Sequence, residues 1–200
     1  KCPAIEKEVS VKVEKKAELS LSISDTEVCE NSSVVLSVNA TNAPKLVWKQ
    51  KNDGESQFSE MAESGDVVNI TATKSATFIV ESSDELACQS AVSNEVSLFV
   101  EEPVSVLLEN VPTEVCEGTT VLLNASITEN CTSYGWKKNE NENFAKNELF
   151  AEDVPTETTT YEFWAKSNVC PEFSKKFVVD VEYVKNVEFT ASESNICKGE

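Results

Sequence analysis

The sequence predicts an all-β protein made of antiparallel β-sandwiches in tandem, and three observations support this fold class. The motif Thr-Glu-Val-Cys-Glu occurs twice, at residues 26–30 and 113–117, so that its two cysteines are 87 positions apart. After each copy, apolar and polar residues alternate with the period of two that is typical of half-buried strands. No 3.6-residue periodicity is sustained, so almost no helix is expected.

The repeat spacing predicts the organisation of the chain into units. Residues 17–102 and 103–185 each form one whole repeat, long enough to bury a sandwich core. We interpret residues 1–16 as the last strand of a preceding repeat, because its three alternating valines follow Cys2 at the offsets seen after Cys170. Residues 186–200 would begin a following repeat. The chain is therefore expected to be a piece of a longer array, with neighbouring repeats as its partners.

Within each whole unit the expected strands follow one order. An opening strand leads to the first cysteine, an alternating strand follows, and a Trp stands 19 or 20 residues after that cysteine. A penultimate aromatic strand and a second cysteine then precede the last strand. The residues expected in the two cores are Trp48, Phe78, Trp136, Tyr161 and Phe163.

This order of strands, with a Trp on the third strand, is the layout of an immunoglobulin-like sandwich. The inter-sheet disulfide of antibody domains has no counterpart, since apolar residues such as Leu36 and Leu123 occupy its positions. Tyr161 stands where a tyrosine corner could form. Its counterpart Phe78 has no hydroxyl.

Charge and composition exclude several classes of partner. The formal charge is −18 and the pI is near 4.4, which argues against nucleic acid and anionic lipid, because both bind clusters of Lys and Arg. No apolar run approaches the roughly 20 residues of a membrane helix. Neither nucleic-acid binding nor membrane insertion is expected of this segment.

Specific motifs carry a resemblance to a known group of proteins. Val-Cys-Glu-Gly at residues 115–118, Tyr-x-Trp at 134–136 and Thr-Thr-Thr-Tyr at 158–161 resemble the tandem Ig-like and PKD-like repeats of large Bacteroidota cell-surface proteins, gliding-motility adhesins among them. The resemblance implies export, by the type IX secretion route, and a structural or adhesive role. The first unit departs from the motif, with Asn31 in place of the glycine and Phe78 in place of the tyrosine.

Cysteine usage indicates the compartment. The seven cysteines recur at repeating positions without a Cys-x-x-Cys pair, which favours disulfides and an extracellular or cell-surface location. The candidates are Cys2, Cys29, Cys88, Cys116, Cys131, Cys170 and Cys197.

Two pairings compete for these cysteines. The simplest joins the two cysteines inside each unit, for example Cys29 with Cys88. In an Ig-like sandwich, however, these positions lie at opposite ends, about 23 Å apart along the strands, and a disulfide tolerates Cα atoms only up to about 7 Å apart. We therefore favour an interdomain disulfide, Cys29–Cys170, with Cys88, Cys116, Cys2 and Cys197 bonded to partners outside this piece. Cys131 stays open, since it could capture Cys170 or Cys29 or remain free.

The residues for catalysis and cofactor binding are missing. The chain has no His, which removes the usual acid–base partner of Ser and Cys nucleophiles, and it has no phosphate-cradling glycine loop. Structural calcium between domains stays open but has no support, because Asp53-Gly54 and Gly65-Asp66 stand alone. No enzyme activity, cofactor or metal site is predicted.

The sequence thus predicts a non-enzymatic stalk segment of a large secreted or cell-surface adhesin or fibre, stiffened by disulfides between neighbouring repeats. One alternative is a module that binds a glycan or a protein through its loops or through the outward-facing Trp164. The other is a spacer in a secreted multidomain hydrolase. Near-copies of one unit add length, which favours the stalk.

Overall fold

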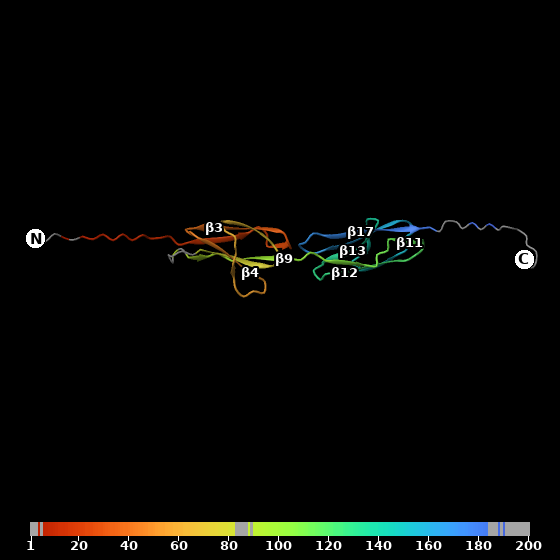
Figure 1. Ribbon diagram of the computed structural model, residues 1–200, viewed down its shortest axis with the longest axis horizontal. Helices are drawn as coiled ribbons and strands as arrows, with labels where there is room; N and C mark the ends of the chain where they lie inside the picture. Colours follow the sequence, from red (N-terminus) through yellow and green to blue (C-terminus); the bar gives the residue numbers. More distant parts are fainter. Residues whose placement is uncertain are drawn as a thin grey trace, which may run out of the picture. The chain divides into compact units, whose positions relative to one another are not determined.

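The computed structural model describes residues 4, 6–82, 88, 90–183, 188 and 190. The chain divides into two compact units, Lys1–Pro103 and Val104–Glu200, close to the predicted boundary between residues 102 and 103. Each unit is a sandwich of two β-sheets (Figure 1). No α-helix occurs in the described ranges, so the predicted all-β, immunoglobulin-like fold class is confirmed.

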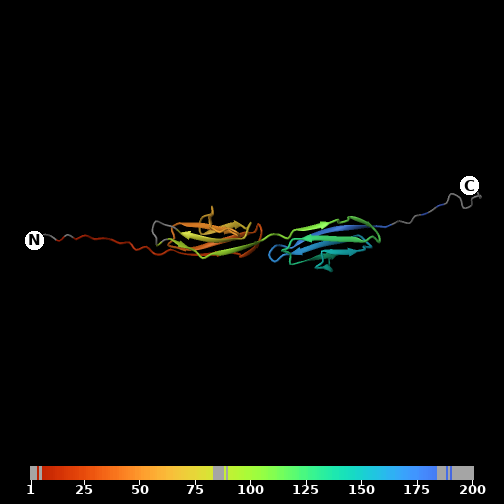
Figure 2. The ribbon, with the colours of Figure 1, turned by 90° about the horizontal axis from the view of Figure 1, so that it is seen from below.

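The described part of unit 1 contains nine strands. One sheet has the order β1-β3-β6 and the other has the order β2-β9-β7-β4-β5, with β8 beside β7. The two sheets face each other across the core (Figure 2). The strands are β1 (Glu18–Ile23), β2 (Glu27–Cys29), β3 (Ser33–Thr41), β4 (Leu46–Asn52), β5 (Ser59–Glu60), β6 (Val67–Thr71), β7 (Ala76–Ser82), β8 (Ala91–Val92) and β9 (Val96–Glu101).

Unit 2 repeats this topology with eight strands among its described residues. Its sheets have the orders β10-β12-β15 and β11-β17-β16-β13-β14. Its edge strand β14 has six residues, whereas the equivalent strand β5 of unit 1 has two. The strands are β10 (Val106–Glu109), β11 (Glu114–Cys116), β12 (Val121–Ile127), β13 (Ser133–Lys138), β14 (Asn141–Lys146), β15 (Phe150–Asp153), β16 (Thr159–Lys166) and β17 (Phe173–Glu182).

Strands in which apolar and polar residues alternate have side chains that are alternately buried and exposed. Along β12, Val121, Leu123 and Ala125 are buried while the residues between them are exposed. One face of the strand therefore joins the core and the other meets solvent, as the period of two requires. The five aromatic residues expected in the cores, Trp48, Phe78, Trp136, Tyr161 and Phe163, are each at most 2% exposed.

Each core Trp also links the two sheets by a hydrogen bond. The indole N–H of Trp48, on β4, donates to the carbonyl of Gly65, 2.9 Å away and just before β6 of the opposite sheet. In unit 2, Trp136 donates to the carbonyl of Leu149 at 3.1 Å, just before β15. The buried indole nitrogen is thereby satisfied, as a buried donor must be.

The cysteine of the Thr-Glu-Val-Cys-Glu motif lies in a short strand in each unit. Strand β2 leaves the first sheet and runs parallel to β9, which places Cys29 opposite Glu101. Strand β11 does the same along β17, with Cys116 opposite Glu182. Three residues are too few for alternation to reveal a strand, and the pairing is long-range.

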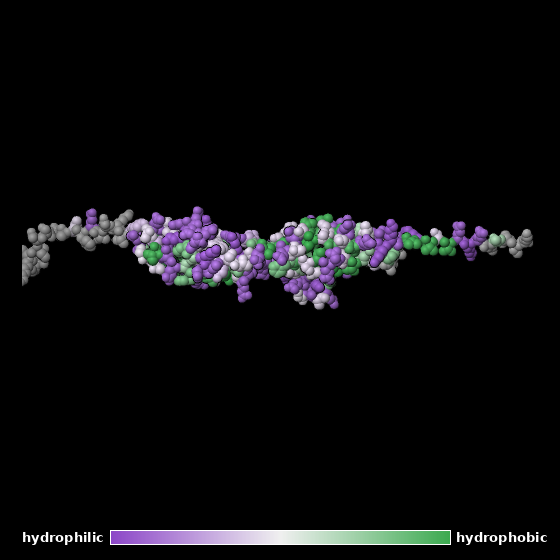
Figure 3. All heavy atoms as spheres, turned by 180° about the vertical axis from the view of Figure 1, so that it is seen from behind, coloured by the Kyte–Doolittle hydropathy of each residue, from purple (hydrophilic) through white to green (hydrophobic). Residues whose placement is uncertain are grey.

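The described residues before β1 have no sheet partner. Residues 6–16 form no strand, and Val9, Val11 and Val13 are 85%, 80% and 88% exposed. Figure 3 shows hydrophobic residues exposed along this segment. Its assignment to a preceding repeat stays a prediction. The expected start of a following repeat falls almost wholly outside the described residues, as do Cys2 and Cys197.

Candidate functional site: cysteines at the ends of the units

Cys29 lies at the end of unit 1 from which the chain leaves, which we term the downstream end. It faces Glu101, the last residue of β9, and the backbone N–H of Glu30 donates to the Glu101 carbonyl at 2.8 Å. The hydrogen bond fixes the cysteine beside the final strand.

Cys170 lies at the opposite, upstream end of its own unit. It occupies the loop between β16 and β17, is 8% exposed, and its N–H donates to the Ser167 hydroxyl at 3.0 Å. The neighbouring β12–β13 loop belongs to the same end, because the Thr132 N–H donates to the Lys166 carbonyl at 2.7 Å. That loop also bonds to Ser105, where the chain enters the unit.

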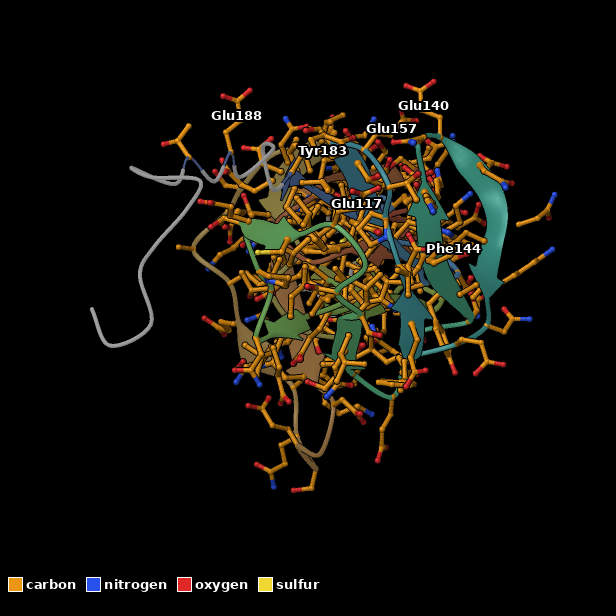
Figure 4. All side chains as sticks on the ribbon, turned by 90° about the vertical axis from the view of Figure 1, so that its right-hand side faces the viewer. Glu117, Glu140, Phe144, Glu157, Tyr183 and Glu188 are labelled. Atoms are coloured by element: carbon orange, nitrogen blue, oxygen red, sulfur yellow. The ribbon has the colours of Figure 1, made fainter. Side chains whose placement is uncertain are left out.

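The other two repeat cysteines occupy the equivalent places. The Ala17 N–H donates to the Cys88 carbonyl at 3.0 Å, so Cys88 lies at the upstream end of unit 1. Cys116 lies at the downstream end of unit 2, where the Glu117 N–H donates to the Glu182 carbonyl at 2.9 Å. Figure 4 looks onto this end, with Glu117 labelled.

This placement rules out a disulfide between the two repeat cysteines of unit 2. Cys116 lies beside the end of β17 and Cys170 precedes its start, and ten residues of strand span about 33 Å. A disulfide needs Cα atoms within about 7 Å of each other. Cys88 and Cys116 are free thiols and exposed, so the simple pairs Cys29–Cys88 and Cys116–Cys170 do not form.

Cys29 and Cys170 are the cysteines that are disulfide-bonded among those in the described ranges. Cys131, for which three fates were open, is a free thiol. It packs against the core of unit 2, and its Sγ donates to the Ser133 carbonyl at 3.3 Å.

Unit 2 also holds a partly buried polar triad that the sequence did not reveal. The Tyr161 hydroxyl donates to Asp153 Oδ2 at 2.5 Å, and Lys138 Nζ lies 2.6 Å from the same oxygen. Burial raises the pKa of Asp153, but the hydrogen bonds from Lys138 and Tyr161 outweigh it and hold the pKa below its usual value. Burial and the Asp153 carboxylate raise the pKa of Tyr161 well above its usual range.

The hydroxyl of Tyr161 therefore differs from the tyrosine corner suggested by its position. In a tyrosine corner the hydroxyl bonds to backbone a few residues upstream. Here a side-chain carboxylate accepts the bond. The one signal in the sequence was Asp153 itself, a charge near the end of an alternating strand.

Trp164 lies on the outer face of its sheet, and two lysines flank it. The ammonium groups of Lys137 and Lys166 are 5.9 and 5.6 Å from the ring centroid, within the range of cation–π contacts. The directly opposite residue is Gly135, where a Cβ would come within 2.6 Å of the Ala145 carbonyl oxygen. The ring is half-buried against its own sheet.

A groove opens in the side of unit 1, between the edge strands β5 and β6. Its volume is about 610 Å³, and buried Phe78 and Leu98 lie at its base. Polar side chains line much of the rest. They include Gln50, Asn52, Glu60, Glu63, Asn69, Thr71, Thr73 and Lys74.

Metal and membrane sites have no counterpart in the described part of the chain. No three side chains of Cys, Asp or Glu there gather closely enough to hold a metal ion. None of the described residues forms a helix with the length and apolar character needed to span a bilayer.

Known proteins that are similar to this chain are found among solved structures. No protein-family model matches the chain, and no curated protein does. Among solved structures, the four N-terminal Ig domains of Dscam1 isoform 7.44 are 14% identical, with a TM-score of 0.46 over 88% of this chain and 48% of that one. Those of isoform 6.9 are also 14% identical, with a TM-score of 0.45 over 79% and 43%. The fibronectin(III)-like modules of Clostridium thermocellum CbhA are 10% identical, with a TM-score of 0.36 over 86% and 100%. The chain spans less than half of the Dscam1 fragments.

Proposed function

We propose that this chain is a non-enzymatic stalk segment of an extracellular adhesin or fibre, in which disulfides between consecutive units prevent bending. The observation that carries the proposal is that Cys29 and Cys170 are both disulfide-bonded. They lie at the downstream end of one unit and the upstream end of the next. We propose that they are bonded to each other.

The length of the connection supports this pairing. Strand β9 ends at Glu101, beside Cys29, and β10 begins at Val106. Five Cα–Cα steps cannot span more than about 18 Å. A connection this short supports the proposal that the two ends it joins share a disulfide.

A Cys29–Cys170 bond would act on both stability and mechanics. It closes a loop of about 140 residues, which in the chain-entropy model stabilises the fold by about 5 kcal/mol. A second covalent connection beside the short linker also removes the hinge that a single linker leaves between domains. A row of units in which each neighbouring pair is connected by a linker and by a disulfide behaves as a rod.

The compartment follows from the same chemistry. Structural disulfides form in oxidising, extracytoplasmic surroundings. The finer assignment, to a Bacteroidota cell-surface protein exported by the type IX route, is supported by the motifs around Cys116, Trp136 and Tyr161. Neighbouring repeats are the proposed partners.

Non-reducing peptide mapping of the native full-length protein tests the pairing. We expect a peptide pair that joins Cys29 to Cys170. A Cys29–Cys88 or Cys116–Cys170 pair would refute the stapled stalk. Small-angle scattering then tests the mechanics: Cys29→Ser with Cys170→Ser should broaden the distribution of interdomain distances, whereas Cys131→Ser, the matched control, should not.

The groove of unit 1 favours a second candidate function, the binding of a polar ligand such as a glycan. Its volume lies in the range of ligand pockets, about 300–1,000 Å³, and amide and hydroxyl side chains line it. A glycan array with the two-unit chain tests this function. A specific signal lost in Asn69→Ala but kept in Asn39→Ala, a control on β3, would support it, and no signal would exclude it.

A further inference from the structure

We infer that β6, at the edge of the groove in unit 1, accepts an extended segment of a partner protein as an additional strand. The segment carries apolar residues at alternate positions and at least one Lys or Arg between them. This inference goes beyond the stalk function and does not depend on the Cys29–Cys170 pairing. It assigns a peptide to the groove, and a glycan is the competing occupant.

The first observation is the row of backbone groups on the open side of β6. Strand β6 ends its sheet and pairs with β3. The Asp66 carbonyl accepts a hydrogen bond from β3, and the Ala72 N–H donates to the carbonyl of the residue before β3, each at 2.8 Å. Because the direction of bonding alternates along an antiparallel strand, the N–H and C=O groups of Val67, Asn69 and Thr71 point away from β3. They are available to an added strand.

The composition of β6 leaves this edge unprotected. Natural edge strands commonly carry charged residues or Pro, which oppose pairing with another chain. The five residues of β6 include neither, and four of them are β-branched. By contrast, the equivalent edge strand β15 of unit 2 carries Glu152 and Asp153. Unit 1 therefore leaves open the edge that unit 2 protects.

The groove beside this edge has an apolar base. Phe78 and Leu98 are buried there, and the partly buried side chains of Met61 and Ile70 line the groove with them. The side chains of an added strand would point alternately to the two faces of the sheet. Every second side chain would lie over this base, so apolar residues at alternate positions fit the groove.

The charges that line the groove favour a basic segment. Glu60 and Glu63 line it and form no ion pair within the described ranges. Lys74 is the one cation among the lining residues, and its charge acts on another carboxylate, since hydrogen bonds from Asn52 and the charge of Lys74 lower the pKa of Glu55. A Lys or Arg of the segment is complementary to the two remaining carboxylates.

Selection from random peptides tests the inference. Ten-residue peptides displayed on phage are selected on the 200-residue chain, and the enriched sequences are synthesised. We expect apolar residues at alternate positions with a Lys or Arg between them. The affinity of these peptides should fall at least about tenfold in Asn69→Pro, because Pro removes an N–H from the open edge and leaves the bonds to β3 in place. Glu152→Pro, the same edge position of β15 in unit 2, is the matched control and should bind as the native chain does.

Asn69→Ala separates a peptide from a glycan. This variant loses the side-chain amide but keeps the backbone N–H, so it should bind the selected peptides with unchanged affinity. Three outcomes would overturn the inference: no peptide that distinguishes the native chain from Asn69→Pro, an equal loss in Glu152→Pro, or a loss in Asn69→Ala. A glycan-array signal that is lost in Asn69→Ala, without such peptides, would assign the groove to a glycan instead.

Hydrogen exchange of the native chain tests the same edge without a substitution, which keeps the inference testable if Asn69→Pro does not fold. With a selected peptide at saturation, the N–H groups of Val67, Asn69 and Thr71 should exchange at least about tenfold more slowly, because they become hydrogen-bonded. Those of Phe150 and Glu152 in β15 should not change. Unchanged exchange along β6 would refute the added strand and would leave the stalk function untouched.

Discussion

The two units share one topology but differ at one edge of the sandwich. This edge lies between β5 and β6 in unit 1 and between β14 and β15 in unit 2. Unit 2 closes this side with Tyr161, Asp153 and Lys138, joined through one carboxylate oxygen. Phe144, on the long edge strand β14, packs beside them, with its ring centroid 6.1 Å from that of Tyr161. In unit 1 the same side is an open groove.

The equivalent residues of unit 1 are apolar or uncharged. Phe78 corresponds to Tyr161, since each faces the second residue after the core Trp of its unit. Ile70 pairs with Val34 as Asp153 pairs with Val121. The third position holds Gln50.

The difference shows that a buried hydroxyl in this position requires a hydrogen-bond acceptor beside it. A hydroxyl at Phe78 would face Ile70, which offers no acceptor, and an unpaired buried hydroxyl is destabilising. In unit 2 the acceptor and a counter-charge are both present. All three positions therefore differ between the units, and the predictions below use this set.

The largest effect is expected from removing either core Trp, the feature that the units share. Trp136→Ala should lower the unfolding free energy of unit 2 by about 3–5 kcal/mol, and Trp48→Ala should do the same in unit 1, through the cavity left behind. Hydrogen exchange by mass spectrometry assigns each loss to a unit. Trp164→Ala is the matched control, and a loss of similar size there would contradict our placement of the cores.

Asp153→Ala should have the next largest effect and should act on unit 2 alone. It leaves the Tyr161 hydroxyl and the Lys138 ammonium without their acceptor, which should cost about 2–3 kcal/mol. Denaturant unfolding followed by hydrogen exchange measures it. Ile70→Ala in unit 1 removes only apolar contacts, so a fall in the protection of unit 2 in that variant would show that the units are not independent.

Titration should distinguish the units at both ends of the pH scale. The pKa of Asp153 is lower in the folded state than in the unfolded chain, so its contribution is full above about pH 4 and is lost as the pH falls through the folded value. The pKa of Tyr161 is raised, so its contribution is lost as the pH rises above about 10. The triple variant Tyr161→Phe, Asp153→Ile and Lys138→Gln lacks both titrating groups. Plots of unfolding free energy against pH for this variant and for the native chain should therefore diverge in the acidic and the alkaline range. Parallel profiles would contradict the triad.

That triple variant should show the smallest effect at neutral pH. Replacing this partly buried ion pair and its hydrogen-bonded partner by the set found in unit 1 should change the unfolding free energy by about 1 kcal/mol or less. The reason is that the desolvation cost disappears together with the interaction. Thermal unfolding measures it. A loss as large as that of Asp153→Ala would mean that the set cannot be exchanged between the units.

Much of this fold is predictable from local patterns in the sequence. Alternation along residues such as Val121, Leu123 and Ala125 identified the strands, and the Trp spacing identified the third strand and the core. The short strand β11 was missed, since a parallel pairing of three residues leaves no periodic signal. The Asp153 carboxylate was missed because its two donors lie 15 and 8 positions away, on different strands.

The sequence alone determined the two units, their order of strands, their core aromatic residues and the ends at which the cysteines lie. These features depend on the alternation of apolar residues, which is local in the sequence, and on the spacing of the repeats, which can be counted along the chain. The tertiary structure decided which cysteines are bonded, that Tyr161 pairs with a carboxylate, and that Ser82 is buried without a partner. Each of these depends on distances and burial set by strand packing, and no spacing along the chain encodes them.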